Sequence, residues 1–258
     1  MDDRRIRLSP EQLYRRIGTA AAPLIIDIRD AAAFALDPTM IVGAVRRPTE
    51  AFERWRQELP DDRFVVVYGA GPGDGRSIAA ALAADGIAAR ALDVGIAQWR
   101  ALGLPTRRLR TGDTGRWVTR ERPKVDRIAC PWLIRRFVDP EVRFLYVPPA
   151  EVAAVAERER ATPYDVTGAE FGHVGERCSF DAFIRLYAIE DAPLDRLALI
   201  VRGADTGRPE LAAEAPLLLA LSQQLSQRFA DDHAMLERGM LLYDALYAWC
   251  RSEVRHAL

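Results

Sequence analysis

The stretch Val65–Ser77, VVVYGAGPGDGRS, decides the fold of the first half of the chain. An apolar run that is typical of a buried strand leads into a loop with four glycines, and a helix follows the loop. Free backbone N–H groups and the helix dipole converge at such a loop, which favours the binding of anions. The sequence therefore predicts an oxyanion cradle whose binding residues are Gly71, Gly73, Gly75 and Arg76.

This cradle lacks a nucleophile. The loop contains no Cys, Ser or Lys before Ser77, and the chain has no Cys or His before Cys130. Cysteine chemistry needs a thiolate of low pKa. The first half is therefore not expected to catalyse such a reaction on its own, and no catalytic residue is assigned.

Composition and charge limit the classes of protein that this chain belongs to. Its 258 residues suffice for two ordinary domains, and its net charge of -1 gives no general attraction to nucleic acid or anionic membranes. The N-terminus MDDRRIRLSP lacks the apolar core of a signal peptide, and no apolar run approaches the roughly 20 residues that span a bilayer. We expect a cytoplasmic protein without membrane contact, and we do not expect DNA binding.

Strands and helices alternate along the first half. The pattern predicts strands in PLIIDIRD, RFVVVYG and AARALDVG, and helices in SPEQLYRRIG, AFERWRQEL, RSIAAALAADG and IAQWRALG. Such alternation is typical of a parallel sheet flanked by helices, in which ligands bind at the carboxyl ends of the strands. Asp27, Arg29 and the glycine loop are expected at that edge.

The two halves are separated by a segment at residues 105–120 that is rich in Pro, Gly, Thr and charge, as in an exposed connection. We therefore expect one domain at 1–110 and another at 116–258. Long amphipathic patterns near the C-terminus predict a mainly α-helical α+β second domain. In its last helix an apolar stripe is expected to form the core. Its residues are Met235, Gly239, Leu242, Leu246 and Trp249.

Four segments within residues 8 to 107 resemble the successive motifs of a rhodanese domain. They are LIIDIRD, IVGAVRRP, VVVYGAGPGDGRS and LDVGIAQWRALGLP. The resemblance implies that Gly69 stands where that family carries its persulfide cysteine, so the module is expected to be an inactive sulfurtransferase. Two interpretations of the loop stay open: a site for an oxyanion such as sulfate, phosphate or chromate, and a scaffold without a ligand.

The second half resembles the C-terminal domain of ChrB-type chromate-resistance proteins over residues 116 to 250. The similar segments are WVTRERPKVDRIACPWLIRRFVDPEVRFLYV, PYDVTGAEFGHVGERCSFDAFI and LALIVRGADT. The resemblance implies a stress-response role in handling or sensing chromate, with a small inorganic anion such as chromate as a partner. Regulators of this family carry an N-terminal DNA-binding region, and the rhodanese-like module in its place argues against a transcription factor.

Metal chemistry belongs to the second half, because all histidines and cysteines lie there. His173 is in a glycine-flanked loop that would present its ring to a cavity. With Asp205 and Asp232 it would supply an imidazole and two carboxylates to a divalent metal ion whose identity the sequence does not fix. The alternative is that Asp205 is an ordinary turn residue and Asp232 an ordinary acid at a helix start.

A basic cluster offers a second binding site. Arg127, Arg135 and Arg136 would clamp a tetrahedral oxyanion if one helix continued through Pro131. Pro131 favours a break there, and the alternative is that these arginines pair with nearby acids. Cys130, Cys178 and Cys250 are too few for a disulfide framework and are expected to be reduced.

Together these observations predict an α/β rhodanese-like domain followed by a mainly α-helical α+β domain that binds a metal ion or an oxyanion. Two alternatives are kept. One is a docking or regulatory protein without ligand chemistry, and the other is a sulfurtransferase that uses a cysteine of the second half. A homo-oligomer is compatible with the sequence.

Overall fold

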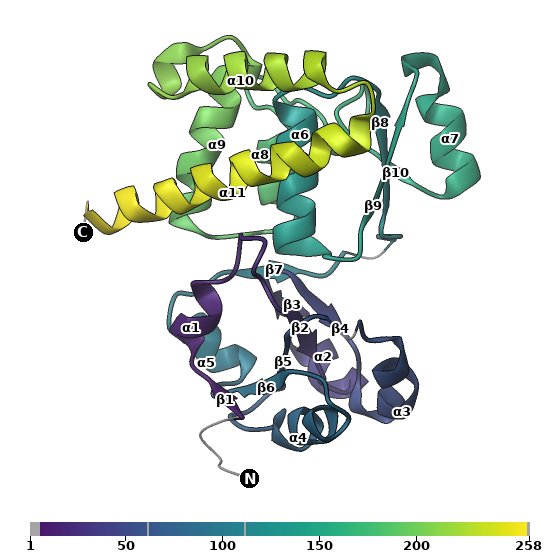
Figure 1. The fold of residues 1–258 in the computed structure, drawn as a ribbon, viewed down its shortest axis with the longest axis vertical. Coiled ribbons are helices and arrows are strands. Elements are labelled where there is room, and N and C mark those ends of the chain that lie inside the picture. Colours follow the sequence, from purple (N-terminus) through teal and green to yellow (C-terminus); the bar gives the residue numbers. More distant parts are fainter. Residues whose placement is uncertain (1–5, 61, 111, 257–258) are drawn as a thin grey trace. The chain divides into compact units, whose positions relative to one another are not determined.

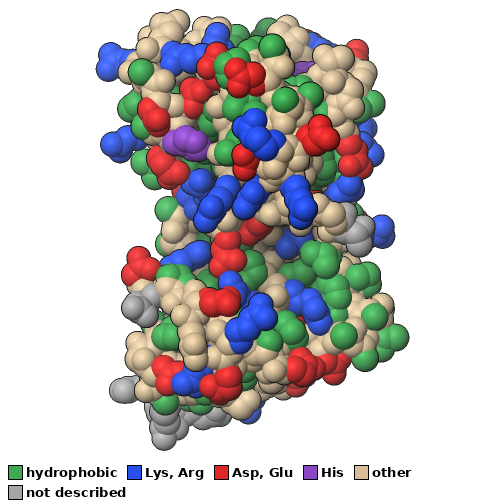
Figure 2. Space-filling model, turned by 90° about the vertical axis from the view of Figure 1, so that its right-hand side faces the viewer, with side chains coloured by type: hydrophobic (Ala, Val, Ile, Leu, Met, Phe, Trp, Pro, Cys, Tyr) green, Lys and Arg blue, Asp and Glu red, His purple; other side chains and the backbone are tan. Residues whose placement is uncertain are grey.

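The computed structural model describes residues 6–60, 62–110 and 112–256 (Figure 1). The chain forms two compact units, Met1–Leu109 with Arg136–Pro140, and Arg110–Arg135 with Glu141–Leu258. Acidic and basic side chains are interspersed over the face shown in Figure 2, as the near-zero net charge leads one to expect. Within the described ranges, no helix combines the length and the apolar character that crossing a bilayer requires.

The first unit contains a parallel five-stranded sheet in the order β1-β6-β5-β2-β4. Its strands are β1 Arg7–Leu8, β2 Leu24–Asp27, β4 Ala44–Arg46, β5 Val65–Tyr68 and β6 Ala89–Leu92. Strands β3 Thr39–Ile41 and β7 Thr106–Arg108 form a separate antiparallel pair. All residues of β2 and β5 are buried, as their continuous apolar runs require. The predicted parallel α/β sheet is confirmed.

Short helices flank this sheet. They are α1 Pro10–Tyr14, α2 Ala31–Leu36, α3 Phe52–Trp55, α4 Arg76–Ala84 and α5 Ile96–Ala101. Helix α1 begins where its sequence predicts, because Ser9 accepts a hydrogen bond from the Gln12 amide while the Gln12 side chain accepts one from the Ser9 amide. Helix α4 follows the glycine loop directly, as predicted.

A buried ionic group lies at the carboxyl ends of β2 and β5. Asp27 and Tyr68 are opposite each other in register, and the Tyr68 hydroxyl donates to Asp27 Oδ2 at 2.9 Å. The Arg29 guanidinium pairs with the same carboxylate and also donates to two backbone carbonyls, those of Asp37 and Thr39. Its donors are therefore directed into the fold.

The second unit contains a small parallel sheet in the order β10-β8-β9. The strands are β8 Arg116–Arg120, β9 Arg143–Val147 and β10 Thr162–Pro163. The predicted exposed connection at 105–120 is therefore wrong in part, since it contains β7 and the central strand β8. Trp117 and Val118 are buried in β8, and Trp117 packs edge-on against Phe171 at 4.8 Å between ring centroids.

Helices make up most of the second unit, which confirms the mainly helical α+β prediction. They are α6 Asp126–Leu133, α7 Val152–Glu159, α8 Ser179–Leu186, α9 Ala192–Asp205, α10 Ala215–Arg228 and α11 Asp232–His256. Figure 1 shows the long α11, in yellow, crossing α6 and α9, and residues of these helices are in contact.

Helix α6 does not break at Pro131. Pro131 is buried inside the helix, which continues to Leu133 and ends in a π-helical turn at Ile134–Val138. Proline removes one backbone donor from the helix, and such a loss is commonly accompanied by a local change of helical geometry. The predicted break is therefore replaced by a change of helix type.

The buried face of α11 differs from the predicted stripe. Leu242, Leu246 and Trp249 are only partly buried. The face that forms the core consists of Met235, Leu236, Gly239, Met240, Tyr243, Tyr247 and Cys250. The rings of Tyr243 and Tyr247 lie 6.1 Å and 5.5 Å from that of Trp132, and this aromatic packing fixes the rotation of the helix.

Candidate functional site

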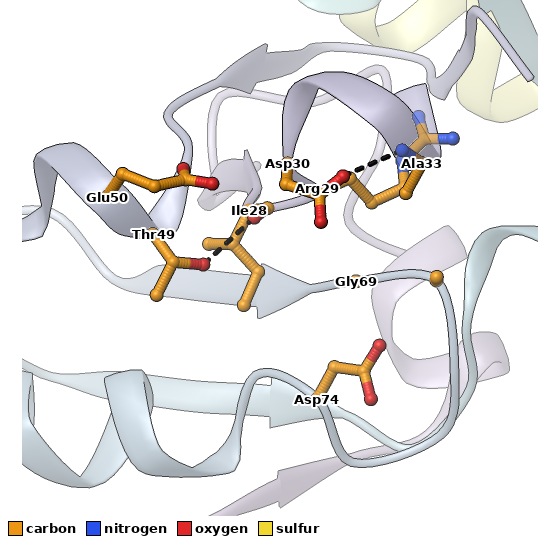
Figure 3. Close-up of a pocket in the computed structure, with 9 residues that line it drawn as sticks. Ile28, Arg29, Asp30, Ala33, Thr49, Glu50, Gly69 and Asp74 are labelled. Atoms are coloured by element: carbon orange, nitrogen blue, oxygen red, sulfur yellow. Dashed lines mark hydrogen bonds between the residues drawn. The ribbon is translucent and has the colours of Figure 1, made fainter. Parts of the chain in front are cut away.

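The glycine loop after β5 borders a pocket of about 560 Å³ (Figure 3). One side chain of the loop itself occupies the cradle: Asp74 Oδ2 accepts a hydrogen bond from the Gly71 amide at 2.7 Å. A Cβ atom at Gly69 would lie 2.6 Å from Asp74 Cβ, so the loop in this shape has no room for a side chain there. The cradle therefore holds a carboxylate of its own.

The charges around this pocket do not favour an external anion. Asp30, Glu50 and Asp74 line it, and Figure 3 shows the Arg29 guanidinium directed away from Gly69. Asp30 also caps helix α2 by accepting from the Ala33 amide at 2.7 Å. Three carboxylates without a free cation repel oxyanions.

Two other predicted residues of the cradle, Gly73 and Gly75, have no room for a side chain. A Cβ at Gly73, whose φ is +87°, would lie 2.8 Å from the Arg76 Nε, and one at Gly75 would lie 2.6 Å from the Val67 carbonyl oxygen. An oxyanion on Gly71, Gly73, Gly75 and Arg76 stays a prediction, and Asp74 is its competitor within the chain.

A second cluster lies in the second unit, around the imidazole of His173. Its Nε2 is 3.2 Å from Asp205 Oδ2, 3.3 Å from Asp165 Oδ1 and 3.5 Å from Asp126 Oδ2. Asp126 begins α6, Asp205 ends α9, Asp165 follows β10, and His173 lies in the loop before α8. Four separate segments thus bring three carboxylates to one nitrogen.

Asp126 is the most buried of these carboxylates, with 1% of its surface exposed. It accepts hydrogen bonds from the Ser179 amide at 2.7 Å, from the Phe180 amide at 3.0 Å, and from Cys130 Sγ at 3.3 Å. The two amides belong to the first turn of α8, where the helix dipole favours a negative charge. The N-terminus of α8 therefore fixes the position of the Asp126 carboxylate.

Asp165 is held from two sides. Its Oδ1 accepts from the Ser179 hydroxyl at 3.1 Å, and its Oδ2 pairs with Arg120 at 2.9 Å and Arg127 at 3.2 Å. Ser179 consequently orients both buried carboxylates, Asp126 through its amide and Asp165 through its hydroxyl.

The backbone at these acids is unusual. Val125, which precedes Asp126, has a φ of +32°, and Asp165 has a φ of +50°. A positive φ is rare for a β-branched residue and is found where surrounding contacts impose the conformation. The acids are therefore placed by tertiary packing.

The neighbouring carboxylates raise the pKa values of His173 and Asp205. Hydrogen bonding to Asp126, together with the charges of Asp126, Asp205 and Asp165, raises the pKa of His173 to about 9. Burial and the charge of Asp126 raise the pKa of Asp205 to about 7. Both shifts reflect negative charge gathered at one point, and a cation at the centre of the cluster would offset it.

The geometry suits a metal ion. Asp126, His173 and Asp205 each offer one ligand atom, and these atoms lie within 4.8 Å of one another. Asp165 adds a further carboxylate oxygen beside the same imidazole nitrogen. One imidazole and several carboxylates are donors for divalent ions such as Zn²⁺ and Mn²⁺. A pocket of about 360 Å³ opens beside His173 and Asp165.

The structure brings two of the three predicted metal ligands together. His173 and Asp205 belong to the cluster, but Asp232 does not, because its Oδ2 accepts a hydrogen bond from the Arg122 amide at 3.0 Å. Asp126 and Asp165 take its place, and sequence analysis missed both. Neither has a spacing that links it to His173, although Asp165 precedes the same glycine-containing loop.

The predicted arginine clamp is not assembled. Arg127 donates to the carbonyls of Arg120 and Glu121 and pairs with Asp165, whereas Arg135 pairs with Glu237 at 2.6 Å. Arg136 lies in the π-helical turn and groups with the first unit. Intramolecular acids and carbonyls thus hold two nitrogens of Arg127 and one of Arg135.

The cysteines are free thiols, as expected. Cys130, Cys178 and Cys250 are each fully buried, and burial raises the pKa of every one of them. Such thiols are poor nucleophiles at neutral pH. A sulfurtransferase that uses a cysteine of the second half is disfavoured on these grounds.

Comparison with known proteins agrees with the two-unit division. Residues 117–250 match the family model of the ChrB C-terminal domain, and residues 9–102 match that of the rhodanese-like domain. Protein ChrB of Cupriavidus metallidurans is 36% identical over 132 residues, which are 51% of this chain and 39% of that protein. The chain therefore spans well under half the length of this curated relative.

Solved structures similar to the first half include a rhodanese-related protein from Thermoplasma volcanium. It is 18% identical with a TM-score of 0.35, over 39% of this chain and 95% of that one. A rhodanese-like domain from Anabaena sp. is 31% identical with a TM-score of 0.29, over 33% of this chain and 90% of that one. Since the ChrB model covers more than half of the residues, this chain belongs to the family of the ChrB C-terminal domain, preceded by a rhodanese-like domain.

Proposed function

We propose that this chain is a chromate-stress protein whose second unit binds a divalent metal ion through Asp126, His173 and Asp205. The observation that carries the proposal is the convergence of three carboxylates on His173 Nε2, at 3.2 to 3.5 Å. Membership of the ChrB family supports the link with chromate.

A metal site explains this cluster better than a structural ion pair does. An ion pair needs one carboxylate, whereas here Asp126 and Asp165 are both buried and Asp205 is largely so. Burying like charges together is unfavourable unless a cation neutralises them. His173 is 43% exposed, so an ion has access to the cluster from its side.

In this proposal the first unit is a non-catalytic rhodanese-like module. No cysteine precedes Cys130 in the chain, and Asp74 fills the loop in which sulfur chemistry would occur. Its contribution is that of a scaffold, and metal chemistry belongs to the second unit.

Elemental analysis of protein purified without a His tag tests the proposal. Wild type, His173→Ala and Asp232→Ala are compared after incubation with Mn²⁺ or Zn²⁺ and dialysis. We expect about one metal ion per chain in wild type and in Asp232→Ala, the matched control outside the cluster, and none in His173→Ala. Absence of metal from wild type, or equal content in His173→Ala, would contradict the proposal and favour the docking alternative.

A further inference from the structure

The pocket beside the proposed metal site lies on its exposed side. Asp126 closes the buried side of the cluster, and His173 and Asp165 form a wall of the pocket of about 360 Å³. A metal ion held by His173 would therefore turn its remaining coordination positions toward this pocket. A volume of that size holds a ligand of several heavy atoms, since one water occupies about 30 Å³.

Arg120 is the cation of this pocket, and part of its guanidinium is free to bind a ligand. One terminal nitrogen, Nη2, donates to the backbone oxygen of Asp165 at 2.8 Å and to its carboxylate at 2.9 Å. Nε is buried and therefore out of reach of a ligand, whereas Nη1 has no hydrogen-bond acceptor among the described residues. Arginine has five N–H donors, and the two on Nη1 lack a partner that the fold supplies.

The neighbouring Arg127 is held at two of its nitrogens and is less exposed. Its Nη1 donates to two backbone carbonyls, its Nε pairs with Asp165, and its side chain is only 17% exposed, against 40% for Arg120. Arg127 holds the site together, and Arg120 faces the space where a ligand would lie.

The charge of the group also favours an anion. The three carboxylates of the cluster and the two arginines that hold Asp165 carry one net negative formal charge. A divalent ion changes this to a net positive charge when His173 is neutral. An incoming anion is then attracted both by the metal and by Arg120.

We infer that the pocket binds a small anion with oxygen donors, with one oxygen on the metal ion and another on the free Nη1 group of Arg120. This inference rests on the proposed metal site. Inorganic oxyanions and small carboxylates share the required chemistry, because each presents two oxygens to a metal and an arginine.

Two measurements on the full chain test the inference. Electron paramagnetic resonance of free Mn²⁺ gives the metal affinity, and calorimetry with sulfate and with acetate gives the anion affinity, with and without Mn²⁺. We expect Mn²⁺-loaded wild type to bind one of these anions. Binding of sulfate would indicate an inorganic oxyanion as the ligand, and binding of acetate would indicate a small carboxylate. In Arg120→Met we expect anion affinity to fall about 10-fold or more, because a charge-assisted hydrogen bond is lost. Mn²⁺ affinity should change less than about threefold, since Arg127 and Ser179 still hold Asp165.

Control variants separate the outcomes. Arg135→Met, which removes an arginine bound to Glu237, should leave the Mn²⁺ and anion affinities unchanged. If Arg120→Met fails to fold, Arg120→Lys replaces it, because lysine keeps the positive charge but lacks the planar guanidinium with its several donors. Mn²⁺ binding without anion binding would overturn this inference alone, as would equal anion affinity without Mn²⁺ or in Arg120→Met. A parallel loss of both affinities in Arg120→Met would assign Arg120 to the support of Asp165. Failure of wild type to bind Mn²⁺ would overturn the metal site and this inference together.

Discussion

The glycine loop of the first unit holds an exposed carboxylate and the His173 cluster of the second holds buried ones, and the two are organised in opposite ways. In the loop, Asp74 meets the Gly71 amide, and the resulting hydrogen bond closes the loop on itself. In the cluster, amides and hydroxyls fix Asp126 and Asp165 so that their oxygens point to a shared centre. The difference teaches that a carboxylate supports ligand binding when other groups orient it and leave one of its oxygens directed at a shared centre.

The largest expected effect follows from removing the most buried carboxylate. Asp126→Ala leaves the Ser179 and Phe180 amides without their acceptor, and each unpaired buried donor costs about 1–3 kcal/mol. The free energy of unfolding should fall by about 2–6 kcal/mol in urea denaturation, with loss of metal binding. Asp30→Ala, which removes an exposed helix cap, should cost only about 1 kcal/mol. Equal losses of unfolding free energy in Asp126→Ala and Asp30→Ala would contradict the view that the carboxylate of the cluster is more deeply integrated in the fold than that of the first unit.

A side chain at Gly69 tests whether the loop is closed around Asp74. Gly69→Ala should lower the free energy of unfolding by about 1–3 kcal/mol, because its Cβ would lie 2.6 Å from Asp74 Cβ. Combining it with Asp74→Gly should recover part of this loss, which a double-mutant cycle from urea denaturation would measure. Simple additivity of the two substitutions would show that Asp74 does not fill the space at Gly69.

Ser179 provides a subtler test, because it touches the carboxylates and not the expected metal. Ser179→Ala removes the hydroxyl that holds Asp165 and should weaken metal binding about 10-fold, the lower end of the effect of groups behind metal ligands. Ser222→Ala, a buried serine in α10, is the matched control and should leave metal affinity unchanged. Titration with Mn²⁺ measures both, and unaltered affinity in Ser179→Ala would mean that Asp165 needs no such support.

The smallest effect concerns the pH dependence of the metal-free protein. Folding raises the pKa of His173 from 6.5 to about 9 and that of Asp205 from 3.8 to about 7, so the folded chain binds more protons than the unfolded chain. The contribution of His173 to stability is fully present below pH 6.5 and is lost as the pH rises through 9. The melting temperature should decline over that range, and less so in His173→Gln. The exposed His233→Gln should follow wild type. An identical decline in His173→Gln would remove His173 as the cause.

Local signals explain which parts of the fold could be predicted. Ser9, the apolar run Val65–Tyr68 and the glycine loop act on neighbouring residues, and their helices and strand are found as expected. Strand β8 was missed because Trp117 is buried by Phe171 and Phe183, which lie far along the chain. The charged residues that flank β8 led to the prediction of an exposed connection at residues 105–120.

The same reasoning applies to the candidate site. His173 and Asp205 stood out because a glycine-flanked histidine and an acid after an apolar run are visible in a short window. Asp126 depends on Ser179, 53 residues away, and its sequence context is that of an ordinary helix start. Packing of α6 against α8 creates this pair, and no local pattern encodes it.

The bond between Asp126 and the first turn of α8 also has a kinetic consequence. The Ser179 and Phe180 amides are protected from hydrogen exchange as long as the Asp126 carboxylate accepts from them. A ligand that fixes Asp126 should slow exchange at these two amides. The exchange rates of these two amides therefore report how long Asp126 keeps its hydrogen bonds to α8.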